Sequence, residues 1–178
     1  MHKVTITPTI RATLAELNCW EIRIGDVEKL ANLLIGNLQI PVLRRGNQTA
    51  IVGGVKSGGS PNRFGEEFRQ LARECATIFD GTELSAICGA AFFHRRFEAI
   101  HPLVDSNGRL GRLLMAEQLR RSFPIEIETI QDKLIEREEE YRAIRVRLAA
   151  QEQFERLVRL LARVVDREIE AVPPCPYP

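Results

Sequence analysis

Twelve consecutive residues combine side chains and spacings that suit nucleotide chemistry. They read His-Pro-Leu-Val-Asp-Ser-Asn-Gly-Arg-Leu-Gly-Arg and run from residue 101 to residue 112. His101 can accept a proton near neutral pH, so it is a candidate general base. Asp105 follows four residues later, and its carboxylate is an oxygen ligand of the kind that Mg²⁺ prefers. The first half of the segment therefore supplies a candidate base and a candidate metal ligand.

The second half of the segment is suited to bind an anion. Asn107-Gly108 allows a backbone with positive φ, which can turn successive N–H groups toward one point. A helix that begins here adds the partial positive charge and the unpaired N–H groups of its N-terminus. Arg109 and Arg112 are three residues apart, so both lie on one helical face and can bind phosphate oxygens. Each of these residues alone is more simply a cap, a turn or a surface charge. Their arrangement within one short segment predicts a site for a nucleotide polyphosphate with Mg²⁺.

The elements that must position this segment are predicted to be mostly helical. The run 83–100, capped by Thr82, carries apolar residues on two opposite sides, which is typical of a helix surrounded by neighbours. The segment 101–108 is predicted to be a loop, and a helix is expected at about 109–121. We therefore expect an all-α fold, a helical bundle around a central buried helix. Periodicity and caps predict further helices that start at Thr7-Pro8 and Gly25-Asp26, and others at 64–78, 132–150 and 151–172.

A different pattern occurs between the second and third predicted helices. Glycines surround the β-prone run Thr49–Val52, and Arg45-Gly46-Asn47 supplies turn residues before it. We expect a short β-hairpin flap at about 45–58. It is the only strand-like piece predicted for this chain.

The composition argues against several classes of protein. The chain has 178 residues with 25 Lys+Arg against 24 Asp+Glu, too even a balance for a protein that coats nucleic acid or anionic membrane. Neither a membrane span of roughly 18 to 20 apolar residues nor a secretory signal is recognisable. Cys19, Cys75, Cys88 and Cys175 show no zinc spacing, so we expect reduced thiols, with Cys75 and Cys88 buried in helices. No nucleic acid, membrane or structural zinc is expected as a partner.

The segment 101–112 resembles the signature of Fic-domain proteins, H-P-F-x-[D/E]-G-N-G-R-x-x-R. Three neighbouring stretches add to the resemblance: His94–Ile100 is similar to the family's H-x-x-F-E-x-I lead-in, Gly111–Met115 to its G-R-L-L-M continuation, and Glu138–Tyr141 to a tyrosine-bearing segment. The family is a helical bundle with a β-hairpin flap beside the signature loop. The resemblance implies a Fic-type domain at 41–172, a helical extension at 1–40 and an extended tail at 173–178.

Most active members of this family transfer AMP from ATP to a Ser, Thr or Tyr hydroxyl of a target protein. The resemblance therefore implies a protein adenylyltransferase, a toxin-like nucleotidyltransferase that uses ATP as co-substrate and Mg²⁺ or Mn²⁺ as cofactor. His101 would deprotonate the target hydroxyl, and Asp105 would hold the metal against the α- and β-phosphates. Arg112 would act in catalysis by gripping the γ-phosphate. The implied ATP-binding set is Asp105, Ser106, Asn107, Gly108, Arg109, Arg112 and Tyr141, and the implied target-docking flap is Ile51, Val52, Gly53 and Gly54.

Two residues depart from the signature. Leu103 replaces the Phe that usually anchors the loop in the core, and Ser106 replaces a small Gly. If that position needs positive φ, serine adds roughly 1 kcal/mol of strain or more. The resemblance therefore leaves alternatives open: another Fic-type transfer, of phosphate or phosphocholine, or a catalytically silent Fic-like module that binds a partner. Doc-type toxins, which transfer phosphate, typically have Lys in place of Gly108, so Gly108-Arg109 favours AMP transfer.

Many Fic enzymes also carry an inhibitory helix with the pattern [S/T]-x-x-x-E-[G/N], whose Glu competes for the second signature arginine. This chain has no complete match. The nearest partial matches place Ile35 where the Glu would stand or keep Glu16 without its flanking residues. The protein is then unregulated, or is inhibited by a separate antitoxin-like protein, or has lost activity. The resemblance implies a cytoplasmic bacterial protein, and it leaves delivery into a host cell and a homo-oligomer open.

Overall fold

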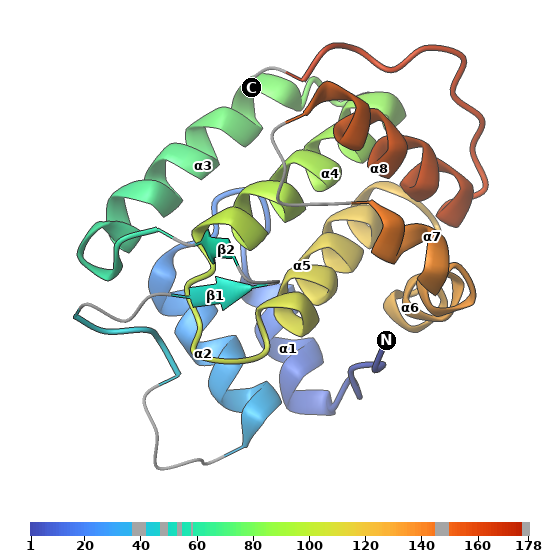
Figure 1. Cartoon of the computed structure of the whole chain (residues 1–178). Coiled ribbons are helices and arrows are strands. Elements are labelled where there is room, and N and C mark those ends of the chain that lie inside the picture. The colour runs from blue at the N-terminus through green and yellow to red at the C-terminus, as the bar shows by residue number, and fades with distance from the viewer. Residues whose placement is uncertain (37–41, 47–49, 53–54, 58, 145–149, 176–178) are drawn as a thin grey trace.

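A long helix, α4 (Glu83–Ile100), runs through the centre of the molecule (Figure 1). It begins where the sequence predicts, because the Oγ1 of Thr82 accepts a hydrogen bond from the backbone N–H of Ser85 at 3.1 Å. Three helices pack against its sides: α3 (Phe64–Ile78), α5 (Asn107–Ser122) and α8 (Gln151–Val164). The apolar residues on both sides of α4 are buried, apart from the exposed Leu84 and the half-buried Ala99. The prediction of a central buried helix is confirmed.

The computed structural model describes residues 1–36, 42–46, 50–52, 55–57, 59–144 and 150–175. Within them, the remaining helices are α1 (Pro8–Glu16), α2 (Ile24–Ile35), α6 (Ile127–Glu136), α7 (Glu138–Ala143) and a 3-10 turn at Pro61–Arg63. Their buried apolar residues and those of the central helices form one core. The predicted all-α fold class is confirmed.

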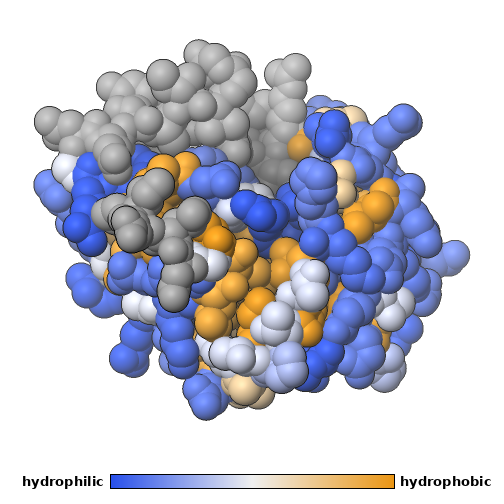
Figure 2. All heavy atoms as spheres, turned by 90° about the horizontal axis from the view of Figure 1, so that it is seen from below, coloured by the Kyte–Doolittle hydropathy of each residue, from blue (hydrophilic) through white to orange (hydrophobic). Residues whose placement is uncertain are grey.

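The helix α1 and the loop that follows it are fastened to the bundle through polar contacts with α5. Arg121 donates to the carbonyl of Leu14 at 2.7 Å, and Gln118 donates to the carbonyl of Cys19 at 2.7 Å. The buried carboxylate of Glu117 orients this end of α5 by accepting from Arg121 at 2.7 Å and from Arg120 at 2.7 and 2.9 Å. From below, the molecule shows a band of hydrophobic residues bordered by hydrophilic ones (Figure 2).

Two short strands lie between α2 and α3. β1 (Ala50–Val52) and β2 (Val55–Ser57) pair antiparallel, with Ile51 opposite Lys56. Gly53 and Gly54, the other two residues of the expected flap, lie outside the described residues, as does Thr49. The use of this strand pair as a docking flap stays a prediction.

The C-terminal third differs from the sequence-based expectation. In place of one helix at 132–150, α6 begins at Ile127, and Arg137 separates it from α7. Glu138–Glu140 then occupy the first turn of α7, where acidic side chains interact favourably with the helix dipole. Residues 145–149 lie outside the described part of the chain.

The last helix is also shorter than predicted, because α8 ends at Val164 and not at 172. Asp166 adopts a left-handed conformation with φ 57°, and the N–H of Arg167 bonds to the carbonyl of Ala162 at 2.8 Å. This is the hydrogen-bond pattern that ends many helices. Ile169, at the end of the predicted apolar stripe, lies half-buried beyond the helix and packs against the core.

Three of the four cysteines lie in the interior of the protein. Cys19, Cys75 and Cys88 are buried, and none of the four cysteines forms a disulfide. Burial raises the pKa of the thiols of Cys19 and Cys88 to about 11 and that of Cys75 to about 12. Among the described residues, no helix is both long and apolar enough to cross a membrane, and no three metal-ligating side chains gather in one place.

Candidate active site

His101 stands at the turn where α4 ends and the signature loop begins. Its backbone is left-handed (φ 50°, ψ 59°), and its N–H caps the helix through the carbonyl of Phe97 at 2.9 Å. The imidazole is largely buried, and its Nδ1 lies 4.0 Å from the buried carboxylate of Glu98. Glu98 was noted in the sequence only as part of the lead-in, yet it is the acid that faces the candidate base.

The side chain of Arg44 holds this turn through hydrogen bonds to backbone carbonyls. Its Nε donates to the carbonyl of His101 at 2.6 Å, and its Nη2 donates to Ile100 at 3.0 Å and Gly59 at 2.8 Å. The guanidinium also lies over the ring of Phe64, 5.1 Å from its centroid. Burial lowers the pKa of Arg44, and the charge of Glu67 acts in the opposite direction. Sequence analysis missed Arg44, because nothing local distinguishes it from Arg45.

The backbone around Arg44 pairs directly with the signature loop. The N–H of Arg44 bonds to the carbonyl of Pro102 at 2.9 Å, and the N–H of Val104 bonds to that of Val42 at 3.0 Å. Leu43 and Leu103 thereby form an antiparallel bridge. The segment that leads into β1 is therefore fixed to the loop that carries the candidate chemistry.

The loop itself is closed by Asn107. Its side-chain carbonyl accepts from the N–H of Leu103, and its side-chain amide donates to the carbonyl of Leu103, both at 2.9 Å. Asn107 is buried, and Leu103 is fully buried at 0% exposure, so leucine anchors the loop in the core where the family signature has Phe. The Asn107 side chain thus shapes the loop, which leaves the backbone N–H groups of the first turn of α5 to bind an anion.

Ser106 has the strained backbone that sequence analysis considered. Its φ is 70°, a left-handed conformation that costs a residue other than glycine on the order of 1 kcal/mol. The hydroxyl of Ser106 accepts a hydrogen bond from Arg109. Its N–H bonds to the carboxylate of Asp105 at 2.6 Å. Serine thus joins its two charged neighbours into one network.

Asp105 is the candidate metal ligand, and its side chain is 79% exposed. The carboxylate also accepts from Arg109 at 3.3 Å. One exposed carboxylate is too few oxygen ligands for a resident metal ion. It fits Mg²⁺ that arrives with a nucleotide, because such an ion keeps several waters and takes its other ligands from phosphates.

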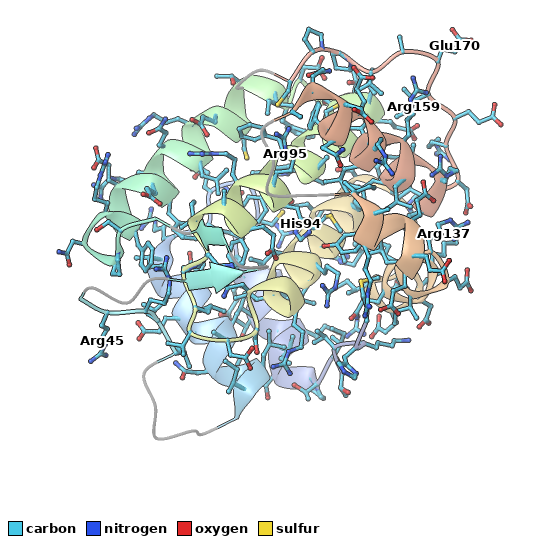
Figure 3. The ribbon with its side chains drawn as sticks, viewed as in Figure 1. Arg45, His94, Arg95, Arg137, Arg159 and Glu170 are labelled. Atoms are coloured by element: carbon cyan, nitrogen blue, oxygen red, sulfur yellow. The ribbon has the colours of Figure 1, made fainter. Side chains whose placement is uncertain are left out.

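Arg112 and Tyr141 meet deeper in the site. The guanidinium of Arg112 lies 5.8 Å from the ring centroid of Tyr141, whose hydroxyl hydrogen-bonds Nε2 of the buried His94 at 2.6 Å. Figure 3 shows His94 in the interior of the bundle. Glycine at 111 allows this close packing of α5 on α4, since a Cβ there would lie 3.0 Å from Nδ1 of His94.

Gly108 marks the point where the charged groups converge. A Cβ on Gly108 would lie 3.1 Å from Nη1 of Arg112 and 3.7 Å from Oε1 of Glu98. The carboxylate that faces His101 therefore also borders the space beside Arg112. The structure brings His101, Arg112 and the start of α5 around one region, as a phosphate-binding site requires.

Residues 60–119, about a third of the chain, match the model of the Fic/DOC family. This segment belongs to the Fic/DOC family. It spans α3, α4 and most of α5, and it includes the whole signature loop. No curated protein and no solved structure matches the chain.

The N-terminal residues border the Fic/DOC segment at both signature arginines, since Met1, His2 and Lys3 line a small cavity together with Arg112. A cavity of about 280 Å³ is lined by Lys3, Arg109 and the end of α2 at Leu33 and Leu34. The side chain of Gln131 pins this N-terminal stretch by accepting from the N–H of Val4 at 2.7 Å and donating to its carbonyl at 3.2 Å.

The two partial matches to the inhibitory pattern lie in different places. Ile35 directly follows Leu34, which shares a cavity with Arg109. Glu16 is exposed and lies 3.5 Å from Lys29. The last turns of α1 contact Arg121, nine residues or about 13 Å of helix beyond Arg112. The end of α2, and not the end of α1, therefore borders the first signature arginine, Arg109.

Proposed function

We propose that this protein is a protein adenylyltransferase, which transfers AMP from ATP to a Ser, Thr or Tyr hydroxyl of a target protein. The observation that carries the proposal is that Arg112 and Glu98, the acid that faces His101, both lie beside Gly108 in the first turn of α5, within a Fic/DOC segment. A base, a guanidinium and a helix N-terminus in one place suit attack of a hydroxyl on a phosphate.

His101 takes the proton of the target hydroxyl as the oxygen attacks. Its Nδ1 faces Glu98 at 4.0 Å, so Nε2 is the nitrogen assigned to accept this proton. The hydroxyl oxygen forms a bond to the α-phosphorus, and the bond from the α-phosphorus to the oxygen that bridges it to the β-phosphorus breaks. The electron pair of that bond leaves with pyrophosphate. The target carries AMP, and the proton rests on His101.

The phosphates are held by α5 and by its two arginines. Arg109 bonds to Asp105 and Ser106 in the structure, and it would exchange these contacts for phosphate oxygens. Arg112 would fork onto the outer phosphate, which fixes the α-phosphorus toward His101. Asp105 would hold Mg²⁺, which when bound neutralises charge on the phosphates. Ile51 and Val52 of β1 would pair with the target chain as an added strand.

A second candidate function is a silent Fic-like module that binds a partner without catalysis. The left-handed conformation of Ser106 favours it, because a strained serine stands where the family has a small residue. Transfer of phosphate or phosphocholine is the remaining alternative.

Labelled ATP separates these functions. The purified chain is incubated with a cell lysate and Mg²⁺, and with ATP labelled at either the α- or the γ-phosphorus. AMP transfer labels a protein only from α-labelled ATP, and intact mass shows one added AMP. Label from the γ-position alone indicates phosphate transfer and contradicts the proposal. A chain that binds ATP in calorimetry but leaves no label and no mass increase supports the silent module.

Replacement of Asp105 by alanine is expected to weaken ATP binding on the order of tenfold or more in Mg²⁺, because the ion loses its protein ligand. In a chelator, the variant should bind ATP as tightly as the wild type or more tightly. The negative charge of Asp105 then no longer repels phosphate, and Arg109 is released. Titration calorimetry measures both affinities, with Glu152→Ala on α8 as the matched exposed control. Weaker binding under both conditions would show that Asp105 serves the loop and not the metal.

A further inference from the structure

A second concave surface lies between α3 and residues 21–24, and none of its lining residues belongs to the signature loop. It has a volume of about 600 Å³. Along α3 it is lined by Gly65, Phe68, Arg69, Ala72, Arg73 and Ala76. We refer to it as the α3 groove. The proposed transferase chemistry does not use it.

The α3 groove is elongated. Its α3 residues recur at spacings of three and four, so they occupy one face of the helix over three turns. From Gly65 to Ala76 this face extends about 16 Å along the helix axis. α3 lies at the edge of the bundle, with its other apolar face buried against the core (Figure 1). A groove of this length suits a second helix better than a compact ligand.

The floor of the groove is apolar, and its α3 side carries small side chains. Phe68 and Ile22 are buried, and Ile24 is half-buried. Ala72 and Ala76 carry only a methyl group, so a neighbouring backbone can approach α3 closely there. A helix with an apolar stripe would contact Ile24 and the methyl groups of Ala72 and Ala76.

The rim of the groove is positively charged. Arg69 and Arg73 are exposed and four residues apart, an arrangement of like charges that disfavours a helix on its own. Two of the acids of α3 bind elsewhere: Glu66 pairs with Arg63 at 3.4 Å, and Glu74 with Arg96 at 3.2 Å. Within the described residues, no carboxylate forms an ion pair with Arg69 or Arg73.

The wall formed by residues 21–24 adds a third arginine. Arg23 lines the groove together with Glu21, so three arginines face one carboxylate there. Most other arginines of the described chain do have a carboxylate partner, for example Arg163 with Glu140. The α3 groove is thus a place where positive charge lacks its counterpart within the protein.

We propose that the α3 groove docks an acidic amphipathic helix of another protein. Apolar side chains of that helix pack on Ile24, Ala72 and Ala76. Carboxylates four residues apart on its flank pair with Arg69 and Arg73, whose forked guanidinium groups suit carboxylate oxygens. Charge complementarity selects an acidic partner over a basic one.

A synthetic helical peptide tests the proposal on the full chain. The probe is an 18-residue peptide, fluorescently labelled, with Leu and Ala on one face and Glu at four-residue spacing on the flanks. Its partner control carries Lys in place of every Glu. Fluorescence anisotropy is expected to show saturable binding of the Glu peptide and none of the Lys peptide. Failure of the Glu peptide to bind the wild type overturns the proposal.

Two matched variants locate the binding. Arg69→Gln/Arg73→Gln is expected to weaken binding of the Glu peptide at least tenfold. Arg159→Gln/Arg163→Gln removes an equally spaced pair from α8 and should leave the affinity within twofold. Equal loss in both variants would mean attraction to overall charge and would overturn the proposal. Circular dichroism confirms that each variant is folded.

A third variant tests the groove without changing charge. Ala76→Trp fills one end of the groove from an exposed position and is expected to weaken binding at least tenfold. Unchanged affinity in this variant would place the peptide outside the groove and overturn the proposal. Sedimentation of the wild type tests whether a second copy of this chain occupies the groove. A dimer that Arg69→Gln/Arg73→Gln dissociates would assign the groove to a second copy of this chain and overturn the acidic partner.

Discussion

Replacement of His101 by alanine is expected to lower AMP transfer by about 10²- to 10⁴-fold, the range typical for loss of a general base. ATP affinity should stay within about twofold. The imidazole stands at the end of α4, and the phosphates would be held by α5 and its arginines. Label transfer from α-labelled ATP measures the rate, and calorimetry measures the affinity.

The control for His101 must separate catalysis from folding. His101 is the cap of α4, and its left-handed backbone is held by Arg44 through main-chain atoms. His101→Gln keeps a polar side chain of similar size but cannot act as a base, so it should be as inactive as the alanine variant. Because the imidazole is largely buried, both variants are expected to unfold at a lower urea midpoint than the wild type, and circular dichroism should show that each is folded under the assay conditions. Wild-type rates in either variant would remove His101 from the mechanism.

The parts of the fold that the sequence predicted well depend on local signals. The start of α4 follows from the Thr82 cap, and the start of α1 follows from Thr7, whose Oγ1 accepts from Ile10 at 3.2 Å. The two apolar sides of α4 predicted its central position, because a helix can be apolar on two sides only between neighbours. Each of these features can be predicted from a few residues that are close in sequence.

The parts that were missed depend on backbone geometry or on contacts distant in sequence. The end of α8 is set by the left-handed Asp166, where the glycine that usually marks a helix end is missing, while the apolar stripe continues to Ile169. At the site, the resemblance placed Asn107 in the ATP-binding set, which stays a prediction, but it gave no sign of the loop contact that its side chain makes. In the structure that side chain closes the loop on Leu103. The roles of His101, Asp105 and Arg112 stay predictions.

Replacement of Arg44 by alanine is expected to lower the free energy of unfolding by about 3 kcal/mol. The change removes the guanidinium that donates hydrogen bonds to the carbonyls of Gly59, Ile100 and His101. A buried acceptor left without its partner costs about 1 to 3 kcal/mol, and water can reach part of this turn. Urea unfolding measures the loss as a lower midpoint with an unchanged slope.

The neighbouring arginine provides the matched control. Arg45 is exposed and points away from the bundle (Figure 3), so Arg45→Ala should change stability by no more than about 0.5 kcal/mol. Arg44→Lys should recover only part of the loss, because one ammonium group cannot reproduce the planar fork that reaches three carbonyls on two segments. Equal stability of the Arg44→Ala and Arg45→Ala variants would show that the hydrogen bonds of the Arg44 side chain contribute nothing to the free energy of unfolding. If these hydrogen bonds act as described, the Arg44→Ala variant also loses transfer activity while it is still folded. The same three hydrogen bonds that stabilise the end of α4 fix the backbone from which His101 projects.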